Sequence, residues 1–222
     1  MKKAMILAAG EGRRLRPLTE KIPKPLVRLG KYCLIEYHLF NFVRAGITEV
    51  VINVNYLSEQ IIAHLGSGER YGLKIHYSVE KEHLETGGGV FNALPLLGDE
   101  PFIVVAGDIF TNFDFVDLPL NIRGDVHLVL TPNPSFHPEG DYVLQKDGYL
   151  NLSGKKLNYG GIAVIHPRLF ADACAGKFKI APLFSRAIKN HLATGQYYEG
   201  PWFNITTLAE VESAQAWCEK NL

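Results

Sequence analysis

The chain has 222 residues and 47% of them are hydrophobic, which is enough for one globular α/β domain but too little for a second full domain. Its 23 basic and 23 acidic side chains cancel, which argues against a nucleic-acid partner, because such proteins normally carry an extended basic face. No apolar run is long enough to cross a bilayer and no signal peptide is recognisable, so we expect a cytoplasmic protein with no membrane partner. The three cysteines lie far apart without metal-binding spacing, as expected of reduced thiols.

The first expected element is a short buried strand over residues 4–9, which ends in a glycine loop followed by cations. Gly10 and Gly12 let the backbone turn sharply and present N–H groups to an anion. Lys and Arg then cluster between positions 13 and 31, beside the single acid Glu20; they are Arg13, Arg14, Arg16, Lys21, Lys24, Arg28 and Lys31. This order predicts a polyphosphate site. The alternative is a solvated basic loop.

The loop differs from the two most common phosphate-binding glycine loops. A dinucleotide fingerprint needs a third glycine and an early helix start, whereas Gly12 is followed by arginines, a leucine and a proline. A P-loop needs Gly-Lys-Ser or Gly-Lys-Thr after the loop, and neither is present. Pro17, Pro23 and Pro25 restrict the segment and so hold its cations in place.

Helices and strands alternate through the rest of the first half. We expect helices over residues 34–45, 57–65 and 88–97, and strands over residues 49–54, 74–79 and 102–106. Such alternation predicts right-handed βαβ units and a Rossmann-like, mixed but mainly parallel sheet flanked by helices. Ligands of such sheets bind at the carboxyl ends of the strands, and Gly10, Glu80 and Asp108 each follow such an end.

After Asp125 the pattern changes to shorter strands. We expect strands over residues 126–130, 142–145, 149–152 and 161–165, with Lys146-Asp147-Gly148 as a hairpin turn. A helix is expected over residues 181–193, and a capping box at Thr207 and Glu210 begins a final helix that ends near Lys220. We therefore expect one domain, residues 1–222, with a nucleotide-binding lobe over residues 1–124 and an acceptor lobe over residues 125–222.

Two motifs resemble those of a known family. The pattern Leu7-Ala8-Ala9-Gly10-x-Gly12-x-Arg14-Leu15-x-Pro17-Leu18-Thr19, with Pro23-Lys24-Pro25-Leu26, is similar to the signature of the sugar-1-phosphate nucleotidyltransferases. Within that family, residues 84–89 (Leu-Glu-Thr-Gly-Gly-Gly) and the segment from Trp202 to Ala209 favour members that act on UTP and N-acetylmuramic acid α-1-phosphate. The resemblance implies the nucleotide-diphospho-sugar transferase fold, Mg²⁺ as cofactor and a place in peptidoglycan recycling. The small size of the chain, without an appended trimerising domain, favours a monomer.

The resemblance also implies roles for individual residues. The backbone of residues 10–13 would cradle the β- and γ-phosphates, Arg14 would neutralise the leaving pyrophosphate, and Lys24 would lie at the α-phosphate. Asp108 would hold Mg²⁺, together with Asn204, which stands where the family's Trp-x-Asp segment has an aspartate. The expected catalytic residues are therefore Arg14, Lys24 and Asp108.

The nucleotide and the sugar phosphate would be bound by two further sets of residues. The nucleotide would contact Leu7, Ala8, Ala9, Gly10, Glu11, Gly12, Arg13, Glu80, Glu85, Thr86 and Gly87. The sugar phosphate would contact Gly107, Gly140, Asp141, Asn158 and Gly161. Glu80 would accept the N3–H of uracil, flanked by the backbone N–H groups of Ala9 and Gly87, whereas cytosine would present an acceptor there.

Two alternatives remain open at this point. The same reaction could use other substrates, such as dTTP or GTP with a hexose phosphate, or CTP with phosphocholine. The chain could also be a nucleotide-sugar-binding protein that has lost turnover, because Asn204 replaces a carboxylate and Gly160 removes a hydroxyl that relatives commonly carry.

Overall fold

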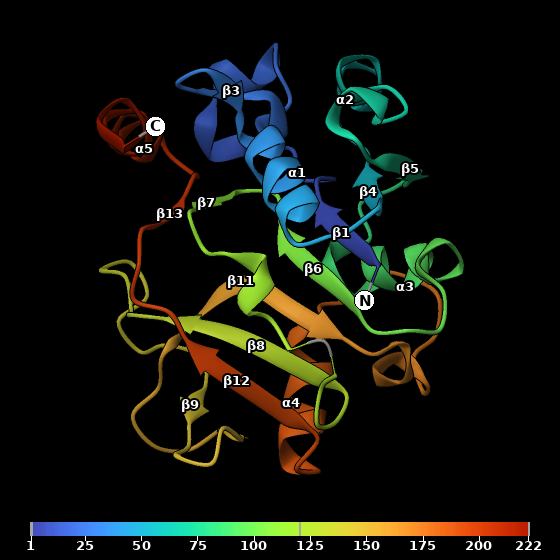
Figure 1. Ribbon diagram of the computed structural model, residues 1–222, viewed down its shortest axis with the longest axis vertical. Helices are drawn as coiled ribbons and strands as arrows, with labels where there is room; N and C mark the ends of the chain where they lie inside the picture. Colours follow the sequence, from blue (N-terminus) through green and yellow to red (C-terminus); the bar gives the residue numbers. More distant parts are fainter. Residues whose placement is uncertain (1, 120, 222) are drawn as a thin grey trace.

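The computed structural model describes residues 2–119 and 121–221, which form a central twisted sheet with helices packed against it (Figure 1). The sheet has seven strands in the order β12-β8-β11-β6-β1-β4-β5, and β11 is antiparallel to both of its neighbours. Its strands are β1 (Lys3–Leu7), β4 (Glu49–Val54), β5 (Lys74–Val79), β6 (Phe102–Ala106), β8 (Val126–Thr131), β11 (Asn158–Ile165) and β12 (Ala193–Tyr197).

The remaining elements surround this sheet. Three small antiparallel ladders pair β2 (Arg28–Leu29) with β3 (Tyr32–Cys33), β7 (Ile109–Thr111) with β13 (Trp202–Asn204), and β9 (Val143–Leu144) with β10 (Leu150–Asn151). The α-helices are α1 (Leu34–Arg44), α2 (Ser58–Leu65), α3 (Glu85–Leu97), α4 (Ala181–Lys189) and α5 (Leu208–Asn221). Short 3₁₀ turns occur at Arg13–Leu15, Leu18–Glu20, Lys24–Leu26, Glu69–Tyr71, Phe115–Asp117 and Pro167–Phe170. Among the residues that the structure describes, no helix is both long and apolar enough to span a membrane.

Alternate side chains of the central strands face two separate cores. Ala4 and Ile6 of β1 pack with α1 and α2 on one face of the sheet, while Met5 packs with α3 and α4 on the other. Because successive side chains of a strand point to opposite faces, the continuous apolar run of β1 is what a strand covered on both faces requires. The sheet is therefore a middle layer between two layers of helices.

A third, smaller core lies away from the sheet and joins the two ends of the chain. Leu15 and Val27, which flank the proline-rich segment, are buried against Val211 and Ala214 of α5. Burying such side chains stabilises the contact by about 1.5–3 kcal/mol for each Val or Leu. The helix near the carboxyl end thus supports the glycine loop near the amino end.

The expected mixed, mainly parallel sheet flanked by helices is confirmed, and three strands in the first half have the expected bounds. One difference is that α3 begins at Glu85, so Gly87 lies inside the helix and not in a loop before it. A Cβ atom on Gly87 would lie 2.5 Å from the Phe178 ring, and one on Gly88 would lie 2.2 Å from the Gly176 carbonyl oxygen. The glycines therefore let the segment around Phe178 pack directly on the first turns of α3.

A second difference concerns residues 181–193, expected as one helix. Helix α4 ends at Lys189, and His191 takes a positive φ of 58°, which breaks the helix before β12 begins at Ala193. The sequence of β12 includes Gly195 and Gln196 and lacks a strong apolar pattern, so its strand character comes from pairing with β8.

A buried imidazole joins this edge strand to the sheet. The His127 ring on β8 lies with Nδ1 2.9 Å from Thr194 Oγ1 and Nε2 2.9 Å from Gln196 Oε1 of β12. Burial lowers the pKa of His127 below its usual value, although the Gln196 hydrogen bond opposes the shift. The folded protein therefore binds fewer protons here than the unfolded chain as the pH falls below about 6.5.

We expect His127 to make the protein less stable in mild acid. Between about pH 7.5 and about pH 5.5 the free energy of unfolding should decrease, because only the unfolded chain protonates this imidazole freely. A His127→Asn variant should be less stable at neutral pH but should show a smaller decrease over the same range, measured by urea unfolding at each pH. The exposed His83→Asn variant is the control, and an unchanged slope in His127→Asn would contradict the assignment.

Candidate active site

The site lies where the parallel central strands end together. Leu7, the last residue of β1, is in register with Asn53 of β4 and Ala106 of β6. The loops that leave these strands are consequently collected at one edge of the sheet, as is Glu80, which follows β5. This edge is the usual ligand-binding side of an open α/β sheet.

The glycine loop forms the wall of a pocket of about 240 Å³ at this edge. Gly12 takes a positive φ of 63°, and its carbonyl accepts a hydrogen bond of 2.8 Å from the Thr19 hydroxyl, which folds the loop back on itself. The pocket is lined by Ala8, Gly10, Gly12, Arg13, Arg14, Lys24, Pro25, Asp108 and Thr206. Three cations in so small a hollow make it suited to a polyanion.

Of the three arginines in the glycine loop, two form ion pairs with Glu11 and the third does not. Arg13 Nε is 2.6 Å from Glu11 Oε2, and Arg16 lies 3.8 Å from the same oxygen. The hydrogen bond from Arg13 lowers the pKa of the half-buried Glu11. No ion pair involves Arg14 within residues 2–119 and 121–221, so its guanidinium reaches the pocket without a carboxylate partner.

Lys24 and Asp108 form the central ion pair of the site. Lys24 Nζ is 2.8 Å from Asp108 Oδ2, and the lysine side chain is only 11% exposed. Lys24 is therefore not an ordinary surface lysine: the two flanking prolines and the aspartate hold it at the floor of the pocket. Its ammonium group is therefore largely buried and paired with a carboxylate at this pocket.

Asp108 also lines a second hollow of about 240 Å³ on its other side. The walls of this hollow come from both halves of the chain and consist of Ala106, Asp108, Ile109, Phe136, His137, Asn158, Tyr159, Gly161, Trp202 and Asn204. The two hollows share Asp108, so a group bound in one can meet a group bound in the other at this carboxylate.

Asn204 is brought to Asp108 by a short ladder between β7 and β13. Asn204 pairs with Ile109, the neighbour of Asp108, and the Ile205 N–H donates a 2.7 Å hydrogen bond to the Asp108 carbonyl. A carboxylate and an amide oxygen are hard ligands of the kind that Mg²⁺ accepts beside phosphate oxygens and water. The residues predicted to hold a metal ion are therefore close together and chemically suitable.

Glu80 lies in a rigid network behind the glycine loop. Its Oε1 accepts a 2.6 Å hydrogen bond from Asn53 Nδ2 and its Oε2 a 3.1 Å bond from the Leu84 N–H, while Asn53 Oδ1 accepts the Ala8 N–H at 2.9 Å. The buried carboxylate thus links β4, the loop after β1 and the approach to α3. Its predicted contact with a base remains a prediction.

The start of α3 corrects part of the expected base site. The Gly87 N–H, expected to face a base, donates instead to the Phe178 carbonyl at 2.9 Å. The Thr86 hydroxyl accepts the Ile180 N–H at 3.1 Å, and Glu85 adopts a positive φ of 60° at the head of the helix. These groups anchor the segment around Phe178, a role that the sequence did not reveal.

The residues predicted to bind the sugar phosphate are divided. Asn158 and Gly161 line the second hollow, and Gly161 has a positive φ of 74° at a bulge in β11. Asp141 instead accepts a hydrogen bond of 2.8 Å from the Tyr159 N–H and pairs with His137. It therefore contacts two residues that line the hollow but does not line it itself. Gly140 packs against Asn133, and a Cβ there would lie 2.8 Å from the Asn133 side chain.

Comparison with known proteins places this geometry in a family. The model of the family described as nucleotidyl transferase matches residues 3–121, which is more than half of the chain. The chain belongs to the nucleotidyl transferase family. Members of this family generally use a divalent metal ion, which agrees with the oxygen donors at Asp108 and Asn204.

Relatives extend the likeness over nearly the whole chain. N-acetylmuramate alpha-1-phosphate uridylyltransferase of Neisseria meningitidis serogroup B is 41% identical over 96% of this chain and 97% of its own length. The enzyme of the same name from Caulobacter vibrioides is 35% identical over 91% of this chain and 90% of its own. A Bacillus anthracis structure, assigned as a glucose-1-phosphate thymidylyltransferase, matches the fold with a TM-score of 0.87 at 20% identity and covers 100% of this chain and 96% of that one.

Several residues of the nucleotidyltransferase site were not predicted. Phe136 and His137 line the second hollow, and Phe136 is 58% exposed, an unusual exposure for an aromatic side chain. An isolated phenylalanine between Pro134 and Pro138 in a polar loop is a signal that the sequence did contain. Thr206 and Tyr159 carry no such signal, because their positions depend on the fold of distant segments.

Substitution by alanine should have different effects at two glycines of the site. A Cβ on Gly10 meets no atom within 4 Å, whereas one on Gly107 would lie 2.5 Å from the Leu7 carbonyl oxygen, where β6 passes close to β1. Gly107→Ala should therefore lower stability by about 1–3 kcal/mol. Gly10→Ala should keep the melting temperature and weaken triphosphate binding, because the methyl group enters the first hollow. Thermal unfolding with and without nucleotide measures both effects, and equal melting temperatures for the two variants would contradict this account.

Proposed function

We propose that this nucleotidyltransferase joins UTP and N-acetylmuramic acid α-1-phosphate to give UDP-N-acetylmuramic acid and pyrophosphate. The observation that carries the proposal is the 41% identity, over nearly the full length of both chains, to the Neisseria enzyme of that name. The product of this reaction is a cell-wall precursor, so the proposal includes a role in recycling cell-wall sugars.

The two hollows on either side of Asp108 suit a transfer between two phosphates. In the proposal the triphosphate lies in the first hollow, on the backbone of residues 10–13, and the sugar 1-phosphate lies in the second. The acceptor phosphate oxygen attacks the α-phosphorus in line, a new P–O bond forms, and the bond to pyrophosphate breaks. No protein nucleophile is needed, because such transfers depend mainly on positioning and on charge neutralisation.

In the proposal, different cations neutralise different phosphates. Lys24 would move its hydrogen bond from Asp108 to the α-phosphate, where negative charge gathers as the new bond forms. Arg14, without a carboxylate partner among the described residues, would neutralise the pyrophosphate. Mg²⁺ held by Asp108 and Asn204 would supply further charge neutralisation when bound.

We also propose UTP as the donor because both relatives named above are uridylyltransferases. Glu80 would contribute as an acceptor for the uracil N3–H, held in place by Asn53 and by the Leu84 N–H. An immobile acceptor discriminates between bases more sharply than a mobile one, because it cannot turn away from the unpaired acceptor of cytosine. We further propose that the protein works as a monomer in the cytoplasm. Its three cysteines are free thiols, as is usual for proteins of that compartment.

The proposal is tested by pyrophosphate release. With Mg²⁺ and UTP, release should be fastest with N-acetylmuramic acid α-1-phosphate and slower with N-acetylglucosamine 1-phosphate or glucose 1-phosphate. With the preferred acceptor, UTP should exceed dTTP, GTP and CTP. If another sugar phosphate gave the fastest release, that compound would be the substrate and N-acetylmuramic acid α-1-phosphate would not. If UTP bound but no acceptor caused release, the protein would be a nucleotide-binding protein and not an enzyme.

Lys24 provides the test of mechanism. Lys24→Ala should lower kcat by about a hundredfold or more, the scale for losing one donor to developing charge, with a smaller effect on the KM for UTP. The exposed Lys21→Ala, in the same loop, is the matched control and should retain activity. Near-normal kcat in a folded Lys24→Ala protein would show that this ammonium group does not act on the reacting phosphates.

A further inference from the structure

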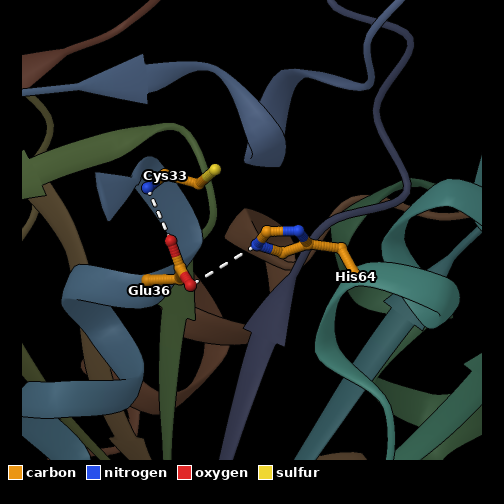
Figure 2. A group of neighbouring side chains, drawn as sticks. All are labelled: Cys33, Glu36 and His64. Atoms are coloured by element: carbon orange, nitrogen blue, oxygen red, sulfur yellow. Dashed lines mark hydrogen bonds and ion pairs between the residues drawn. The ribbon is translucent and has the colours of Figure 1, made fainter. Parts of the chain in front are cut away.

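We propose that Cys33, Glu36 and His64 form a site for a borderline-soft divalent cation such as Zn²⁺, separate from the metal ligands Asp108 and Asn204. The three side chains come from the end of β3, the first turn of α1 and the last turn of α2 (Figure 2). One potential ligand atom from each, Sγ, a carboxylate oxygen and a ring nitrogen, lies within 4.8 Å of the others. Nothing in the transfer reaction uses this group.

The histidine is paired with Glu36 only loosely, without a well-formed hydrogen bond. His64 Nε2 is buried and has no hydrogen-bond partner, although it lies 3.4 Å from Glu36 Oε1. A buried ring nitrogen without a well-formed hydrogen bond is unfavourable. In Figure 2 the ring nitrogen faces the carboxylate, and a cation between them would satisfy both groups.

The carboxylate is held as a metal ligand requires. Glu36 Oε2 accepts the Cys33 N–H at 2.7 Å, and the Tyr71 hydroxyl donates to Oε1 at 2.7 Å. Such outer hydrogen bonds orient a ligand and typically change metal affinity about 10–100-fold. The Arg70 guanidinium lies 3.5 Å from Oε1 and would oppose a cation, but its side chain is 53% exposed and has solvent into which it can turn.

The donor set determines the class of cation. Thiolate, imidazole and carboxylate together favour Zn²⁺, whereas Mg²⁺ prefers oxygen ligands alone. Three protein ligands leave the fourth tetrahedral position to water. Burial raises the pKa of the Cys33 thiol to about 11, so metal binding must release its proton and should weaken as the pH falls.

A cation here would join α1 to α2 and would reach the glycine loop indirectly. Gln60 of α2 donates a 3.1 Å hydrogen bond to the carbonyl of Lys21, which precedes Lys24 in the loop. Fixing α2 against α1 would therefore limit the movement of the segment that carries the catalytic lysine. The expected effect of Zn²⁺ is a rise in melting temperature, because the ion binds the folded chain preferentially.

The test uses Co²⁺ as a spectroscopic substitute for Zn²⁺ in the full-length protein without a histidine tag. We expect one Co²⁺ per chain, with the intense near-ultraviolet band of a sulfur–cobalt bond, and loss of that band on adding Zn²⁺ but not Mg²⁺. Cys33→Ser should abolish the band and the Zn²⁺-dependent rise in melting temperature. Serine is itself a good N-cap, so this variant keeps the helix start that Cys33 now provides.

Two further variants keep the result interpretable. Cys174→Ser removes an exposed thiol and should leave both the band and the thermal shift unchanged. His64→Gln keeps the thiol and should weaken Co²⁺ binding at least tenfold, about the smallest effect expected for a lost metal-site contact. A wild-type protein with no cobalt–sulfur band, or a band that persists in Cys33→Ser, would show that the group is only a helix cap and an ion pair.

Discussion

The parallel pairing of β1 with β4 and β6 is the constraint on which the site depends. It brings the end of β1 level with Asn53 and Ala106, so the glycine loop and Asp108 leave the sheet side by side. Between β1 and the turn after β6 there is no room for a side chain, and Gly107 meets this requirement. The candidate site is thus positioned by backbone hydrogen bonds, which buried backbone groups must form.

Charge within this frame is arranged around one carboxylate. Asp108 lines both hollows and forms an ion pair with Lys24. The largely buried ammonium group of the lysine therefore already has a charged partner. A buried charge without a partner would be costly, and in the proposed reaction Lys24 would exchange the carboxylate for a phosphate oxygen. In the same proposal Asp108 would also hold Mg²⁺ together with Asn204, and the ion would supply further charge neutralisation.

The sequence predicted well what local patterns determine. The strands after α1 and α2, the glycine loop and the position of Asp108 follow from apolar runs and from punctuation by glycine and proline. The sequence did not reveal β12, whose residues become a strand only beside β8, or the anchoring of Phe178 on α3. Likewise, Tyr159 and Thr206 line the hollows through tertiary packing, which no local pattern records. Site residues close to one strand end were thus predictable, and those assembled from several distant segments were not.

The third core has a consequence for how the molecule opens. Leu15 and Val27 pack against Val211 and Ala214, which lie near the other end of the sequence. Bringing such remote segments together has an entropic cost, and none of these four residues belongs to the seven-stranded sheet. A partial opening that detaches α5 would leave the seven-stranded sheet in place and loosen the segments packed on this helix, which include the glycine loop and β2. If the glycine loop binds the triphosphate as proposed, heating would weaken binding before it unfolds the sheet.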